Sequence, residues 1–137
     1  MLIFSDSLSR FCTPVAAAGA IFLASSGISS AERQWAVLSE ADNAIIVEAL
    51  SRKMLDPDST RVSNLLAATH DDEPEFIYVC GDVQGRNGFG GYAQPTMFIG
   101  ALVPNAEGIK KFAVITIAEQ GGFSAVAKHC ISVMPTK

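Results

Sequence analysis

The residues best able to do chemistry lie in one stretch, CGDVQGRNGFGGY, which runs from Cys80 to Tyr92. Within it Asp82 could serve as a general base and Tyr92 as a general acid, in a cleft that also contains Arg86. Such a reaction needs these side chains to lie close together in the folded protein. Their spacing along the chain gives no evidence that they do. A small enzyme that uses Asp82 and Tyr92 is therefore an alternative, and the sequence favours a function other than catalysis.

The same stretch is better interpreted as a turn that offers a binding surface. Its glycines lack the lysine of a P-loop and the βαβ context of a dinucleotide fingerprint. Asn87-Gly88 predicts a tight hairpin reversal, which leaves two aromatic rings unexplained. We predict a binding surface at Arg86, Asn87, Phe89 and Tyr92. In it Tyr92 is structural, Phe89 is partly exposed, and Arg86 and Asn87 form a polar edge.

Other reactive residues fit no catalytic or metal-binding pattern. The acidic run HDDE at 70–73 has no further ligand at a recognisable spacing, so we assign no metal site and no cofactor. Ser124 lacks the second glycine of a nucleophile elbow. His129 and Cys130 are neighbours, and neighbouring side chains on a helix point about 100° apart. The sequence therefore assigns no catalytic residue.

The elements that must position these residues begin with a helix, predicted over Glu32 to Leu55. Ser39 followed by Asp42 indicates an N-cap, and Pro57 ends the helix. Apolar residues recur at helical spacing and form one face for a core. They are Ile45, Ile46, Ala49, Leu50 and Met54.

Short apolar segments bounded by turn residues follow the helix and predict four strands. They are Arg61 to Thr69, Phe76 to Gln84, Thr96 to Val103 and Phe112 to Ala118. Their connections are too short for parallel crossovers, which favours an antiparallel meander. Phe123 to Ile131 then predicts a short closing helix. The expected fold class is α+β, with the N-terminal helix packed on a four-stranded antiparallel sheet.

The N-terminal block resembles an export signal. The uncharged run from Phe11 to Ala24 follows Arg10, and the small residues Ser29 and Ala31 suit a signal peptidase. We therefore predict a signal peptide at 1–31 and one domain at 32–137, which a chain of 137 residues allows. An uncleaved segment that anchors the protein in the membrane is the alternative.

Charge and cysteine content narrow the partners and the compartment. The chain carries a net charge of −4 without a Lys/Arg cluster in sequence, which argues against nucleic acid as a partner. Cleavage after Ala31 would leave Cys80 and Cys130 as the two remaining cysteines. In an oxidising compartment this pair predicts one disulfide, and two buried reduced thiols are the alternative.

A pattern across the middle of the chain resembles a group of small exported proteins of Gram-negative bacteria. The resemblance spans roughly Met54 to Phe98. Its first matched segment is Leu-Asp-Pro-Asp-Ser at 55–59. The resemblance implies a periplasmic location and supplies no activity. Its remaining matched residues are Cys80, Gly81, Val83, Asn87, Gly90, Gly91, Tyr92 and Phe98.

Together these observations predict a periplasmic or secreted domain that binds a protein or a small molecule. The alternatives are the enzyme described above and a subunit of an envelope assembly. The subunit would use the second apolar face of the sheet, because both faces of the last strand are fairly apolar.

Overall fold

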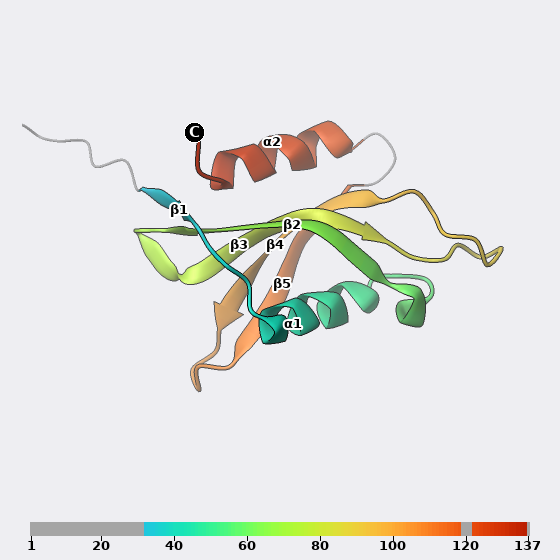
Figure 1. The fold of residues 1–137 in the computed structure, drawn as a ribbon, viewed down its shortest axis with the longest axis horizontal. Coiled ribbons are helices and arrows are strands. Elements are labelled where there is room, and N and C mark those ends of the chain that lie inside the picture. The colour runs from blue at the N-terminus through green and yellow to red at the C-terminus, as the bar shows by residue number, and fades with distance from the viewer. Residues whose placement is uncertain (1–31, 119–121, 137) are drawn as a thin grey trace, which may run out of the picture.

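The computed structural model describes residues 32–118 and 122–136, and the predicted signal peptide at 1–31 lies outside them. Five antiparallel strands form one sheet in the order of the sequence. Figure 1 shows helices α1 and α2 on opposite faces of this sheet, which gives three layers. The elements are β1 (Arg33–Trp35), α1 (Glu40–Ser51), the short 3-10 helix η1 (Pro57–Ser59), β2 (Arg61–His70), β3 (Glu73–Gln84), β4 (Thr96–Pro104), β5 (Lys110–Ile117) and α2 (Phe123–Val133).

The predicted α+β class, the antiparallel meander and both helices are confirmed, and two details are corrected. The sheet has a fifth strand, because Arg33–Trp35 pairs with His70, Thr69 and Ala68 of β2. The predicted helix over Glu32 to Leu55 is therefore too long. All three residues of β1 are exposed, so this strand has no alternation of buried and exposed residues that could reveal it in the sequence.

Helix α1 starts at the predicted cap. The Ser39 hydroxyl accepts a hydrogen bond from the Asp42 backbone N–H (3.1 Å), and the Asp42 carboxylate accepts one from the Ser39 backbone N–H (3.0 Å). These reciprocal bonds satisfy two N–H groups that a helix start would otherwise leave unpaired. The carboxylates of Glu40 and Asp42 also complement the positive end of the helix dipole.

The core under α1 contains the largest fully buried side chains. Ile46 and Leu50 of α1 pack into a cluster with Phe98 of β4, and all three are fully buried. The rings of Phe98 and Phe112 meet edge to face, with centroids 6.1 Å apart. Gly100 makes this packing possible, because a Cβ there would collide with the Phe112 ring and lie 2.6 Å from the Ala113 carbonyl oxygen.

The core under α2 is built from smaller side chains and includes the disulfide. Cys80 of β3 and Cys130 of α2 are bonded, with Cα atoms 6.0 Å apart, which confirms the predicted pair. Three residues later in the same helix, the His70 ring Nε2–H donates to the Val133 carbonyl oxygen (2.8 Å). Helix α2 is therefore attached to the sheet by one covalent bond and one polar contact, in addition to apolar packing.

A second aromatic ring supports His70. The rings of His70 and Tyr78 lie with centroids 4.8 Å apart. The Tyr78 hydroxyl donates to the Glu73 carboxylate (2.6 Å), and this bond raises the pKa of Tyr78 to about 12. The phenol is held neutral because it is the donor in that bond. The pairs thus order the end of the sheet where α2 finishes.

Within the part of the chain that the structure describes, no helix is long and apolar enough to cross a membrane.

Candidate functional site

The stretch singled out by sequence forms the hairpin between β3 and β4, whose tip projects beyond the end of the sheet (Figure 1). Arg86 and Tyr92 pair across it as an isolated antiparallel bridge. The Asn87 carbonyl oxygen accepts from Gly90 N–H (3.0 Å), and Asn87 N–H donates to the Gly91 carbonyl (2.7 Å). Gly90 adopts a positive φ of 82°, which favours glycine. The expected reversal is present, but Gly90 rather than Gly88 supplies the left-handed conformation.

The Asn87 side chain fixes this turn from inside. Its Oδ1 accepts from the backbone N–H groups of Phe89 (3.0 Å) and Gly91 (3.2 Å). The β4–β5 turn has the same arrangement, with Asn105 Oδ1 accepting from Glu107 and Ile109. Turn chemistry therefore explains Asn87 and Gly90, and the side chains that the turn displays remain available for function.

The two aromatic residues of the hairpin have different environments. The Tyr92 ring is 37% exposed and lies 4.0 Å from the guanidinium carbon of Arg61 and 5.6 Å from that of Arg86. Cations at these distances are attracted to the ring face, so Tyr92 holds both guanidinium groups in place. Phe89 is 100% exposed, which is more than the partial exposure we expected.

The base of the hairpin is tied to η1. Arg86 backbone N–H donates to the Ser59 hydroxyl (2.7 Å), which itself donates to the Asp56 carbonyl oxygen (2.8 Å). Leu55, 78% exposed, lies beside the tip, with its Cδ2 atom 3.9 Å from where a Cβ on Gly88 would stand. A pocket of about 300 Å³ separates the hairpin from the end of α1. The hairpin thus presents Phe89 and Leu55 on an anchored backbone.

Asp82 does not join the residues of the tip. Its carboxylate accepts a hydrogen bond from the Asn64 side-chain amide (2.8 Å), at a bulge in β2 where Asn64 takes a φ of 53°. Tyr92 contacts the two arginines instead, and no hydrogen bond joins it to Asp82 in the described part of the chain. The acid and base of the enzyme alternative are therefore not brought together.

The remaining reactive residues are placed without a partner for catalysis. Ser124 and His129 are exposed on α2, and Cys130 is in the disulfide. The HDDE run spans the β2–β3 turn, with His70 ending β2 and Glu73 beginning β3. Among the described residues, no group of three or more His, Cys, Asp or Glu side chains is arranged to hold a metal ion.

An apolar groove that the sequence did not reveal lies between α2 and the sheet. It has a volume of about 360 Å³ and is bordered by exposed Leu66 and Ile131, with Asn64 and Asp82 as its polar residues. Helix α2 lies on the second face of the sheet, which the assembly alternative would use, and this groove leaves part of that face open. Leu66 and Ile131 are 65 positions apart in the sequence, so no local pattern could have joined them.

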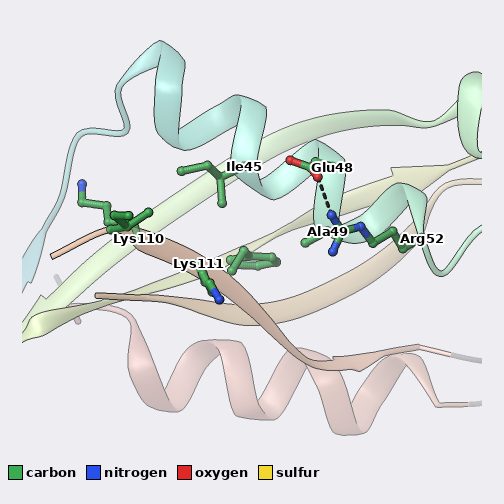
Figure 2. A pocket seen from close by; sticks show the side chains of 8 residues that line it. Ile45, Glu48, Ala49, Arg52, Lys110 and Lys111 are labelled. Atoms are coloured by element: carbon green, nitrogen blue, oxygen red, sulfur yellow. Dashed lines mark hydrogen bonds and ion pairs between the residues drawn. The ribbon is translucent and has the colours of Figure 1, made fainter. Parts of the chain in front are cut away.

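A second groove, of about 480 Å³, lies between α1 and β5. Figure 2 shows Ile45 and Ala49 pointing from α1 toward β5, while Glu48 and Arg52 form an ion pair at the rim. Lys110 and Lys111 line the side formed by β5. A smaller neighbouring pocket shares Ala49, Arg52 and Phe112 and adds Lys53 and Val114, so the two form one continuous groove.

One end of this groove is fixed by a partly buried ion pair. Lys110 Nζ lies 2.8 Å from Asp42 Oδ1, and the Asp42 side chain is only 6% exposed. The pKa of Asp42 is lowered, and the hydrogen bond from Lys110 is the largest cause. Burial acts in the opposite direction, and the two hydrogen bonds from Ser39 lower the pKa further. Asp42 therefore joins the start of α1 to the start of β5.

No protein-family model, curated protein or solved structure matches the chain.

Proposed function

We propose that this chain is a periplasmic binding domain that recognises a protein partner through the β3–β4 hairpin. The observation that carries the proposal is the complete exposure of Phe89 at the tip of an anchored turn. An aromatic ring on a fixed backbone buries a large apolar area at little cost in conformational entropy, which makes such rings frequent centres of protein interfaces.

The surroundings of Phe89 define the chemistry of the partner. Leu55 extends the apolar surface, while Arg61 and Arg86 are held beside it by Tyr92. Asn87 is used by the turn itself, so its contribution is to the shape of the surface. A partner with an apolar pocket for Phe89 and carboxylates around that pocket would complement this surface.

The Cys80–Cys130 disulfide supports a periplasmic location, because such bonds persist in oxidising compartments. The expected signal peptide and the resemblance to exported proteins point the same way.

Site-specific photocrosslinking tests the proposal. A benzoyl-phenylalanine at position 89 should give a discrete crosslinked adduct in cells that produce the protein. Phe123 is the matched control, since it is also an exposed phenylalanine (59%), on α2. The adduct should be absent with the probe at position 123 and weakened when Arg86→Ala is added. Equal adducts at both positions, or an adduct indifferent to Arg86→Ala, would contradict the proposal.

A stability control separates recognition from folding. Phe89→Ala removes a side chain that is fully exposed, so the free energy of unfolding should change by less than about 0.5 kcal/mol. A large loss of stability would mean that Phe89 serves the fold.

The assembly alternative retains one supporting observation, the apolar groove beside α2. The enzyme alternative gains none from the described residues, because Asp82 and Tyr92 have separate partners.

A further inference from the structure

The outer side of β5 is an open edge of the sheet. β5 is the last strand in the sheet order, and its pairing partner among the described residues is β4. In an antiparallel edge strand, alternate residues direct their N–H and C=O groups away from the sheet. Such an edge can pair with an added strand, which is a recurrent way of binding extended peptides.

The regular part of this edge is as long as the groove beside it. The pairing of β5 with β4 shifts between Val114 and Thr116, so Ile115 is an extra residue that ends the regular ladder. The segment from Lys110 to Val114 spans about 14 Å at the usual rise of a strand. The groove-lining residues of α1 and of the turn that follows it, Ile45 to Lys53, span about 12 Å at the helical rise.

The groove is apolar in its centre and cationic at both ends. Ile45, Ala49 and Phe112 form the centre. Lys110 lies at one end, beside the start of α1, while Arg52 and Lys53 lie at the other. Together with Lys111, four of the ten Lys and Arg residues of the chain gather here, although the net charge of the chain is −4.

Nearby carboxylates offset only part of this positive charge. Glu48 pairs with Arg52, and Asp42 pairs with Lys110. Lys53 and Lys111 form no ion pair within the described ranges. The charge that remains is complementary to an acidic ligand and unfavourable to a second copy of this edge, which would bring another pair of lysines to the same contact.

From these observations we propose that the α1–β5 groove binds an extended acidic peptide segment of a partner protein, which adds to the sheet beside β5. Alternate residues of a strand lie on one face. An apolar side chain of the peptide would therefore enter the centre of the groove, and acidic side chains two residues before and after it would lie toward Lys110 and Arg52. This site is separate from the hairpin tip and does not depend on its function.

A symmetric peptide tests the proposal in either strand direction. The probe is acetyl-Ser-Glu-Thr-Val-Thr-Glu-Ser-amide with a fluorescent label, and binding is measured by fluorescence anisotropy. A matched peptide with glutamine in place of both glutamates should bind at least fivefold more weakly, since it keeps the shape and loses the charge. A peptide N-methylated at valine and at both threonines should lose binding, because it lacks donors on both sides of the strand.

Protein variants locate the binding. Lys53→Glu, at the cationic end of the groove, should weaken binding about tenfold or more, whereas Lys128→Glu, an equal charge change on an exposed residue of α2, should leave it within twofold. Saturation with the probe should slow hydrogen exchange at backbone amides of residues 110–114 by at least tenfold. Thermal melting of each variant identifies any loss of folding.

Several results would overturn the proposal. They are no binding of the probe, equal binding of the glutamine or N-methylated peptide, equal effects of Lys53→Glu and Lys128→Glu, or slower exchange only at residues that do not belong to β5. Phe89→Ala should leave peptide binding unchanged, so a failure at the hairpin and a failure at this groove are measured separately.

Discussion

Helices α1 and α2 cover opposite faces of the same sheet, yet they are attached to it by different means (Figure 1). The α1 face has large, fully buried side chains such as Leu50 and Phe98, and a capped helix. The α2 face has smaller buried side chains, and its helix is bonded to β3 by the disulfide. The comparison indicates that apolar burial holds the first face, while the second depends on a covalent bond that requires an oxidising compartment.

The largest expected effect lies in the α1 core. Phe98→Ala should lower the free energy of unfolding by about 4–5 kcal/mol, because it removes a fully buried ring and leaves a cavity against Phe112. Urea denaturation measures it. Phe123→Ala, on the exposed side of α2, is the control and should cost less than about 0.5 kcal/mol. A loss below about 1 kcal/mol for Phe98→Ala would refute the central role of this core.

The disulfide tests the other side of the comparison. Replacing Cys80 and Cys130 by alanine should cost at most about 4 kcal/mol, the loop-closure estimate for a bridge that spans 50 residues. Because the bond also attaches α2 to β3, hydrogen exchange should accelerate more in α2 than in α1. If both helices lost protection to the same extent, the two faces would be one cooperative unit and the comparison would fail.

The smallest effect concerns the polar attachment of α1. The pKa of Asp42 is lower in the folded protein than the usual value near 3.9, chiefly because Lys110 bonds to its charged form. Asp42 therefore contributes stability above about pH 4, and this contribution is lost as the pH falls through its folded-state pKa.

Asp42→Asn should cost about 1–2 kcal/mol at pH 7, as for the loss of a helix cap, and less at pH 3. Urea denaturation at the two pH values checks this. Asp71→Asn, at an exposed turn, should have an effect below about 0.5 kcal/mol at both. A cost for Asp42→Asn that is the same at both pH values would argue against the ion pair.

Local patterns in the sequence predicted the elements whose signals are local. The Ser39 cap, the four longer strands and the closing helix follow from spacing and turn residues, and the cysteine pair follows from count and compartment. β1 was missed because its three residues are exposed and gain their strand geometry from pairing with β2. The extended conformation of β1 is therefore set by its pairing with β2 and not by its own sequence.

The candidate sites also differ in whether their residues are close together in the sequence. The hairpin could be predicted as a turn, and its exposed ring could be suspected, because all of its residues lie within one stretch. The two grooves could not, since each is lined by residues far apart in the sequence, such as Arg52 with Lys111 and Asn64 with Ile131. Sequence reasoning offered Asp82 and Tyr92 as an alternative acid–base pair, whereas the structure bonds Asp82 to Asn64 and places Tyr92 against Arg61 and Arg86.

The two asparagine turns have a consequence for engineering. Asn87 and Asn105 each begin a turn with the same backbone hydrogen bonds, and each is followed three residues later by a glycine with positive φ, Gly90 and Gly108. The two loops thus share one backbone design, and we expect Ala-Glu from one to replace Gly-Phe in the other without altering the path of the chain. In both turns the asparagine and the glycine set the backbone, while the two residues between them are exposed. Those two positions are therefore suited to substitution with other side chains.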